Sequence, residues 1–264
     1  MRRDPKGGWG EDGKGRQMRI DILTLFPNMF SGPFDESIIK RAIDNNIVSI
    51  VLHNLRDWGL GKHKTVDDYP FGGGSGMVMK PEPIFEAVEA IKAQGGDSSA
   101  QVILLTPQGR VFNQKIAAEL ANFGRLIFIC GHYEGVDERI REHLATDEIS
   151  IGDYVLTGGE LAAMVVIDAV IRQLPGVLGS EESASDESHT TGLLEYPQYT
   201  RPQTYRNWEV PQVLISGNHA QIAKWRREQS ILRTSMRRPD LFDKANLSSE
   251  ERRLAANRAG NRFD

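Results

Sequence analysis

Over most of its length the chain alternates short apolar runs with amphipathic helical segments, and this alternation constrains the fold more than any other feature. Apolar runs of strand length cover residues 19–26, 47–54, 101–106 and 126–130, and helical patterns cover residues 36–45, 82–93, 113–121 and 161–171. Strands that alternate with helices of this length are typical of an α/β fold. We therefore predict a mostly parallel sheet with flanking helices.

Two glycine-rich segments adjoin apolar stretches and predict a binding site. Residues 131–139 come directly after the run that ends at Cys130, and residues 151–160 lead into the helical pattern at 161–171. Glycine lets the backbone approach a ligand where a side chain would block it. In open α/β sheets, ligands bind beyond the carboxyl ends of the strands. We therefore expect a small-molecule pocket lined largely by main chain.

Two further loops leave alternatives open. Residues 71–77 are glycine-rich, but they lack the Lys-Ser/Thr that completes a phosphate-binding P-loop. This segment is either a mobile loop that closes over a large substrate or a plain flexible loop. Residues 106–110 follow an apolar run and are either part of the same pocket or a simple turn.

Composition excludes several classes of protein. With 264 residues, 39% hydrophobic and 26% charged, the chain is typical of a globular protein. Its single cysteine, Cys130, excludes an intrachain disulfide framework, and the histidines lack metal-ligand spacing, so we predict no metal site. The longest apolar run is interrupted by Asp168 and is too short to cross a bilayer. Residues 1–17 lack the apolar core of a signal peptide, so we predict a cytoplasmic location. We interpret them as a disordered extension or as a misplaced start ahead of Met18.

The C-terminal part of the chain has the opposite charge balance from the middle. Residues 131–199 hold 14 acidic residues against three arginines, whereas residues 219–264 hold 11 basic residues against six acidic ones. A helix after Gly217 is predicted by an apolar stripe from Ile222 to Met236, and Ser248 with Glu251 forms a capping box before a last helix. The excess of basic residues favours a partner with many negative charges, although a solvated helix face is the simpler alternative.

Several long motifs in one order resemble the bacterial tRNA (guanine-N1)-methyltransferases of the SPOUT class. They include MRIDILTLFP at 18–27, FGGGSGMVMKPEP at 71–83, CGHYEGVDERI at 130–140, SIGDYVLTGGELAAM at 150–164 and SGNHAQIAKWRREQS at 216–230. The resemblance covers residues 18–250. It implies a deep trefoil knot in the parallel sheet, a rare exception to unknotted topology. It also implies a small, mainly helical C-terminal domain.

The resemblance implies a division of the chain and a methyl donor. Residues 18–178 would form the knotted S-adenosylmethionine-binding domain, residues 179–196 a flexible linker, and residues 197–264 the tRNA-binding domain. The donor contacts carried over from the family are Pro107, Gly109, Gly131, Tyr133, Glu134, Ile151, Gly152, Asp153, Tyr154, Val155, Leu156, Gly158 and Gly159.

The implied reaction is methyl transfer to N1 of guanine 37 of tRNA, in a homodimer whose active site lies at the subunit interface. Arg172 matches the family's arginine that stabilises charge on guanine O6. The general base departs from the family's pattern, in which an Asp precedes Ser. Ungapped counting places Glu187 at that position, and we favour it over Asp186. The resemblance also implies a dependence on Mg²⁺, for which the sequence offers no dedicated set of ligands.

The tRNA anticodon stem-loop is the partner that the resemblance implies. The cations expected to bind its phosphates are Lys224, Arg226, Arg227, Arg233, Arg237 and Arg238. Two alternatives are weighed against this function. Another SPOUT enzyme that methylates ribosomal RNA would share the glycine-rich loops, and a non-catalytic RNA-binding protein would share the basic C-terminal part.

Overall fold

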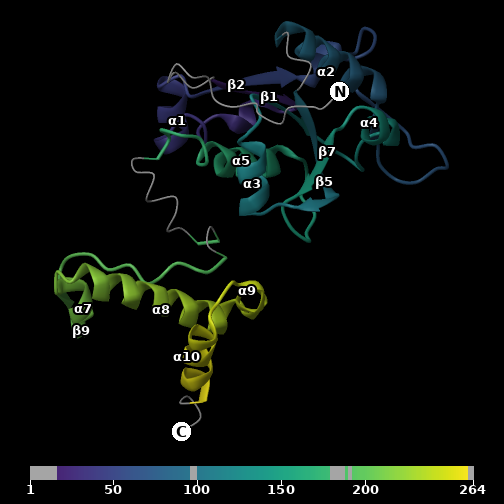
Figure 1. Cartoon of the computed structure of the whole chain (residues 1–264). Coiled ribbons are helices and arrows are strands. Elements are labelled where there is room, and N and C mark those ends of the chain that lie inside the picture. The colour runs from purple at the N-terminus through teal and green to yellow at the C-terminus, as the bar shows by residue number, and fades with distance from the viewer. Residues whose placement is uncertain (1–16, 96–99, 179–187, 190–191, 261–264) are drawn as a thin grey trace, which may run out of the picture. The chain divides into compact units, whose positions relative to one another are not determined.

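The computed structural model describes residues 17–95, 100–178, 188–189 and 192–260. The chain divides into two compact units, the first ending at Gly179 and the second beginning at Ser180 (Figure 1). Residues 1–16, part of the predicted N-terminal extension, and residues 179–187 of the predicted linker lie outside the described residues. Among the described residues, no helix is both long and apolar enough to cross a membrane.

The first unit is built on a five-stranded sheet, as the alternation predicts. The strands lie in the order β2-β1-β6-β5-β7, and every neighbouring pair is parallel. The prediction of an α/β fold with a mostly parallel sheet is therefore confirmed. The strands are β1 (Met18–Thr24), β2 (Val48–Asn54), β5 (Gln101–Val111), β6 (Arg125–Cys130) and β7 (Asp147–Ser150).

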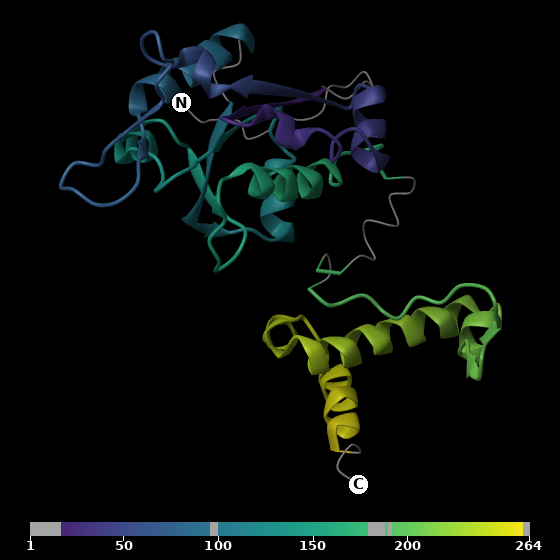
Figure 2. The ribbon, with the colours of Figure 1, turned by 180° about the vertical axis from the view of Figure 1, so that it is seen from behind.

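Helices cover both faces of this sheet, as Figure 1 and, from behind, Figure 2 show. Side chains alternate between the faces of a strand. In β6, Phe128 packs in one core cluster with α1 (Ser37–Asp44), α3 (Gln114–Leu120) and α5 (Glu160–Ile171). Ile127 and Ile129 pack in the other cluster with α2 (Pro81–Gly95) and α4 (Glu138–His143). A central strand buried on both sides explains why residues 126–130 are continuously apolar.

Residues 106–110, for which we predict either part of the pocket or a simple turn, lie inside the longer strand β5. Leu105 and Arg110 of β5 both pair with Ile149 of β7, so residues 106–109 bulge out of the ladder. A β-bulge re-aims side chains next to functional sites. Short elements that the sequence did not predict are η1 (Pro27–Phe30), η2 (Leu55–Trp58), β3 (Asp67–Asp68) and β4 (Val78–Met79).

After β7 the chain returns from the edge of the sheet to its middle. Gly159 N donates a hydrogen bond of 2.8 Å to Gly131 O, directly after β6. α5 begins at the next residue and packs on β6. The trefoil knot that the resemblance implies concerns how the chain threads at this return, and it stays a prediction.

The second unit is mainly helical. Its small core contains Leu193 and Ile231, which are 2% and 0% exposed. Leu193 falls within the range predicted as linker, and its neighbour Leu194 donates its backbone N–H to Thr234 Oγ1 at 2.9 Å. The elements are β8 (Thr204–Tyr205), β9 (Trp208–Glu209), α7 (Gln212–Ile215), α8 (His219–Arg237), α9 (Pro239–Lys244) and α10 (Ser249–Gly260).

The predicted helix after Gly217 is α8, capped by the Asn218 side chain, which accepts from Gln221 N at 3.1 Å. Its buried face differs from the predicted stripe. Met236 is 54% exposed, and Ile231 and Thr234 are buried in its place, because α9 and α10 pack on that side of α8. The capping box is confirmed, since Glu251 and Ser248 exchange hydrogen bonds of 2.8 and 3.2 Å.

Candidate functional site

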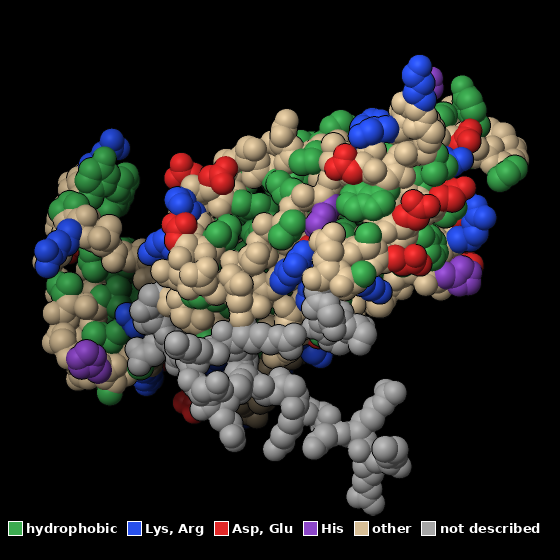
Figure 3. Space-filling model, turned by 90° about the horizontal axis from the view of Figure 1, so that it is seen from above, with side chains coloured by type: hydrophobic (Ala, Val, Ile, Leu, Met, Phe, Trp, Pro, Cys, Tyr) green, Lys and Arg blue, Asp and Glu red, His purple; other side chains and the backbone are tan. Residues whose placement is uncertain are grey.

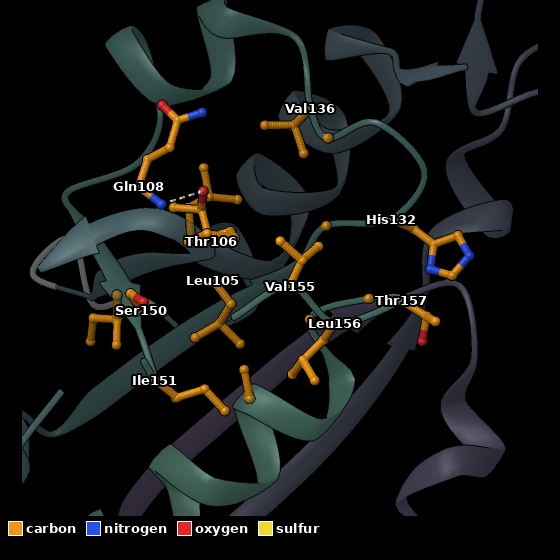
Figure 4. A pocket seen from close by; sticks show the side chains of 18 of the residues that line it. Leu105, Thr106, Gln108, His132, Val136, Ser150, Ile151, Val155, Leu156 and Thr157 are labelled. Carbon is orange, nitrogen blue, oxygen red and sulfur yellow. Dashed lines mark hydrogen bonds between the residues drawn. The ribbon is translucent and has the colours of Figure 1, made fainter. Parts of the chain in front are cut away.

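A cavity of about 320 Å³ lies beyond the carboxyl ends of three neighbouring strands, β5, β6 and β7. Three segments form its walls: residues 104–108, residues 131–136 and residues 149–159. Figure 4 shows apolar side chains from two of these walls, among them Leu105, Ile151 and Leu156, converging on the same space. Its position is the one that open α/β sheets use for ligands.

The bulge of β5 forms the first wall. Thr106 Oγ1 accepts a hydrogen bond of 3.3 Å from Gln108 N, which holds the bulge in shape (Figure 4). Gly109 closes the bulge against β7, where an added Cβ would lie 2.4 Å from the backbone carbon of Glu148. No side chain fits at Gly109, so this glycine is needed for strand packing rather than for contact with the cavity.

The loop after β6 forms the second wall and is tied to the glycine-rich segment. Tyr133 has a positive φ of 59°, and Glu134 N donates to Met77 O at 3.0 Å. Met79 N donates to Gly135 O at 3.0 Å. Residues 77–79 therefore fix the conformation of a loop that lies more than 50 residues further along the chain. Burial raises the pKa of Tyr133, and the Asp67 carboxylate raises it further.

The third wall touches the second through glycines. His132 and Gly158 form an isolated bridge, and a Cβ on Gly159 would lie 2.8 Å from Cys130 Cα. Glu160 starts α5 just behind this contact, is 1% exposed, and accepts a hydrogen bond of 2.7 Å from Thr24 Oγ1. This buried contact joins α5 to the carboxyl end of β1.

Polar side chains enter the cavity on the side of α4. Arg141 Nη1 lies 3.4 Å from Glu148 Oε2, its Nε lies 3.5 Å from Glu138 Oε2, and its guanidinium also contacts Gln108. Glu134 and Glu138 add two carboxylates to the lining. The cavity thus combines an apolar slot, main-chain hydrogen-bonding groups, carboxylates and the Arg141 guanidinium, which suits a ligand with a flat apolar ring and charged groups.

The structure brings most of the predicted donor contacts together. Gly109 and Asp153 do not line the cavity. The predicted residues that do line it are Pro107, Gly131, Tyr133, Glu134, Ile151, Gly152, Tyr154, Val155, Leu156, Gly158 and Gly159.

Other lining residues were missed by the sequence reasoning. Some belong to the strand ends themselves, and Glu138 and Arg141 share one face of the short helix α4 because they are three residues apart. The three-residue spacing of Glu138 and Arg141 was the sequence signal that could have identified these two lining residues. The missed residues are Leu104, Leu105, Thr106, Gln108, His132, Gly135, Val136, Glu138, Arg141, Ile149, Ser150, Thr157 and Ala162.

Arg172, the one predicted catalytic residue that the structure describes, does not line this cavity. Arg172 caps the carboxyl end of α5, whereas Gly159 at the other end of the same helix lines the cavity. A 12-residue helix is about 18 Å long. Asp186 and Glu187 lie outside the described residues. Within the part of the chain that the structure describes, no cluster of three His, Cys, Asp or Glu residues could hold a metal ion.

The predicted RNA-binding cations lie on or next to α8 with different surroundings. Lys224, Arg237 and Arg238 are exposed, and Arg233 is half-buried. Arg227 binds Glu251 at 2.8 Å and Arg238 binds Asp240 at 2.7 Å, while Arg226 lies over the Tyr196 ring at 4.7 Å. Exposed ion pairs are weak, so phosphates can replace these carboxylates. Figure 3 shows one view of the surface, on which acidic and basic side chains are interspersed.

Comparison of the sequence with known proteins shows the family of this chain. The family model described as tRNA (Guanine-1)-methyltransferase TrmD matches residues 18–244. The chain belongs to this family. Curated tRNA (guanine-N(1)-)-methyltransferases are close relatives. The one from Dehalococcoides mccartyi is 63% identical over 237 residues, covering 90% of this chain and 95% of the relative. Those from Desulforamulus reducens and Geobacillus kaustophilus are 57% and 60% identical, covering 90% and 89% of this chain and 93% and 96% of those relatives.

Proposed function

We propose that this member of the tRNA (guanine-1)-methyltransferase family transfers the methyl group of S-adenosylmethionine to N1 of guanine 37 of tRNA, beside the anticodon. The observation that carries the proposal is the cavity at the ends of β5, β6 and β7, formed by the segments that carry the family's motifs. The name of the curated relatives supports the class of substrate and the acceptor atom. A tRNA substrate also supports a cytoplasmic location.

The lining of the cavity fits the methyl donor. Its volume of about 320 Å³ is typical of a pocket for a small molecule. Ile151, Val155 and Leu156 line the cavity and would supply an apolar slot for the adenine, and the carboxylates of Glu134 and Glu138 would be available to the donor's positive groups. Where Gly131 stands, a larger side chain would fill space that the ligand needs. When bound, the donor supplies a sulfonium methyl that already carries a good leaving group.

The acceptor nitrogen must lose its proton before it can attack the methyl carbon, because guanine N1 carries a hydrogen at neutral pH. A carboxylate that accepts this proton contributes about 10²- to 10⁴-fold in rate. We assign this role to Glu187 in preference to Asp186, both outside the described residues. In single-turnover methylation, Glu187→Gln should lower the rate by that factor and Asp186→Asn should change it little. The reverse result would assign the general base to Asp186. If both variants methylate at the wild-type rate, neither residue is the general base.

We assign Arg172 to guanine O6, where negative charge grows as the N1 proton leaves. Its distance along α5 from the cavity supports an active site formed by two copies, in which Arg172 of one chain reaches the cavity of the other. α5 itself supports this arrangement. Leu161 and Val165 are each 49% exposed on a helix whose other apolar side chains are buried or half-buried. Exposed apolar side chains on the outer face of a mostly apolar helix offer a surface that a partner can cover.

The basic C-terminal unit is the part that we assign to the tRNA anticodon stem-loop. Lysine and arginine contacts to phosphates make binding fall as salt rises. The cations assigned to phosphates are those of α8 and its end: Lys224, Arg226, Arg227, Arg233, Arg237 and Arg238. We assign no described residue to Mg²⁺.

The experiment that tests the function uses two tRNA transcripts that differ only at nucleotide 37. We expect transfer of a labelled methyl group from S-adenosylmethionine to the transcript with guanine 37, as 1-methylguanosine, and none to the transcript with adenine. Methylation of a ribosomal RNA fragment instead would favour the other SPOUT activity. Tight tRNA binding without methyl transfer would favour a non-catalytic RNA-binding protein.

A further inference from the structure

The β8–β9 hairpin of the C-terminal unit presents an aromatic pair to solvent. Tyr205 is 57% exposed and Trp208 is 65% exposed, and every residue from 201 to 209 is exposed. Exposure of two large rings on one short hairpin is uncommon, because burial of aromatic surface is favourable. The hairpin therefore offers a surface that a partner can cover.

The two rings and the arginine between them are held in a defined arrangement. Tyr205 and Trp208 are directly opposite each other in the antiparallel pair, with ring centroids 6.2 Å apart and ring planes at 40°. The guanidinium carbon of Arg206 lies 5.4 Å from the Tyr205 centroid and 5.8 Å from the Trp208 centroid. A hydrogen bond of 3.0 Å from Val210 N to Gln203 O closes the base of the hairpin.

This combination of groups matches the chemistry of an unpaired nucleotide. Nucleobases stack on aromatic rings and on guanidinium planes, and the guanidinium also attracts the phosphate of the same nucleotide. A purely apolar protein partner would not require a cation between the rings. Residues 219–264, which follow the hairpin, carry an excess of five positive charges. Charge therefore favours an RNA strand over a protein surface.

The hairpin also lies next to the helix that we assign to phosphate binding. Figure 1 places β9 and α7 at the end of α8 where that helix begins. Lys224, in the second turn of α8, has an 80% exposed side chain. We propose that Tyr205, Arg206 and Trp208 form a stacking platform for an unpaired nucleotide of the RNA substrate. This inference rests on the RNA-binding role proposed above and adds a base contact to the phosphate contacts of α8.

The test measures the dissociation constant of the full-length protein for tRNA at several salt concentrations. Base stacking on aromatic side chains predicts that the double variant Tyr205→Ala/Trp208→Ala binds about 5- to 100-fold more weakly. Because the variant removes no charge, the dependence of log Kd on log salt should keep its slope. Tyr205→Phe/Trp208→Phe keeps both rings and should bind like the wild type. Met236→Ala, which removes an exposed apolar side chain from the same unit, is the matched control.

The possible results separate this inference from the proposed function. If the wild type binds and methylates tRNA but the double alanine variant binds equally well, the platform is wrong and the function stands. If the wild type does not bind tRNA, the stacking platform and the proposed function are both wrong. Weaker binding that accompanies dissociation of a dimer, measured by analytical ultracentrifugation, would assign the hairpin to a protein interface and overturn the inference. Weaker binding with the dimer intact and the phenylalanine variant unaffected supports it.

Discussion

At the scale of single residues, Asp21 shows how the centre of the sheet holds a buried charge. Its side chain is fully buried in β1, and three side chains bind it: Arg19 at 2.8 Å, His53 at 2.8 Å and Arg125 at 2.9 Å. Burial by itself would raise the pKa of Asp21. The hydrogen bonds from His53, Arg19 and Arg125 outweigh that effect, and the pKa is lowered to about 2.

This lowered pKa predicts a specific loss of stability in acid. The Asp21 contribution is present above the ordinary pKa of 3.8 and is lost as pH falls from there towards 2. Asp21→Asn should therefore flatten the pH dependence of the free energy of unfolding in that window. At neutral pH it should destabilise the fold by about 3 to 5 kcal/mol, because the buried Arg125 loses its counter-charge. Urea unfolding between pH 2.5 and pH 7 measures the pH dependence and the loss of stability at neutral pH. An unchanged pH dependence in the variant would contradict the lowered pKa of Asp21.

Sequence reasoning found the glycines of the site but could not assign a role to each. Gly131, Gly158 and Gly159 line the cavity as predicted contacts, whereas Gly109 packs against Glu148, which is distant in the sequence. A close approach of two backbones depends on strand register, which a single sequence does not specify. The same limit applies to Asp21, because its three partners come together only when β1, β2 and β6 pair.

At the scale of elements, the bulge in β5 links the edge of the sheet to the cavity. Gly109→Ala would place a methyl group 2.4 Å from the backbone of β7. The strands must separate to accept it, so we expect destabilisation of about 1 to 3 kcal/mol. The same movement displaces Thr106, Pro107 and Gln108, so affinity for S-adenosylmethionine should fall as well. Thermal unfolding measures the loss of stability, and titration calorimetry measures the loss of affinity. A variant with wild-type stability would show that the bulge accommodates the methyl group without strain.

Elements with strong periodicity were predictable, and those that depend on tertiary pairing were not. α1 and α3 lie within one residue of the predicted ranges at each end, since their apolar spacing is a local signal. β3, β4, β8 and β9 have two residues each, too few for any pattern to appear. β7 was missed because its sequence, Asp-Glu-Ile-Ser, does not alternate or form an apolar run.

At the scale of the whole molecule, the proposed homodimer predicts that two defective subunits complement each other. Arg172→Ala removes the proposed O6 contact, and Gly131→Val fills the donor cavity. If Arg172 of one chain serves the cavity of the other, a heterodimer of these two variants has one intact site. Purified with two different affinity tags, it should regain about half of the wild-type activity per dimer, while each homodimer stays inactive. An inactive heterodimer would place Arg172 and the cavity in the same chain.

The central claim is that the cavity between β5, β6 and β7 binds the methyl donor, and titration calorimetry with S-adenosylmethionine tests it most directly. Gly131→Ala suits this test because the nearest atoms to the added methyl group would lie 3.7 and 3.8 Å away, which leaves the fold unstrained. We expect the wild type to bind the donor and Gly131→Ala to bind it about ten-fold more weakly or worse, with unchanged thermal stability. A wild type that does not bind the donor, or a variant that binds it equally well, would contradict the account.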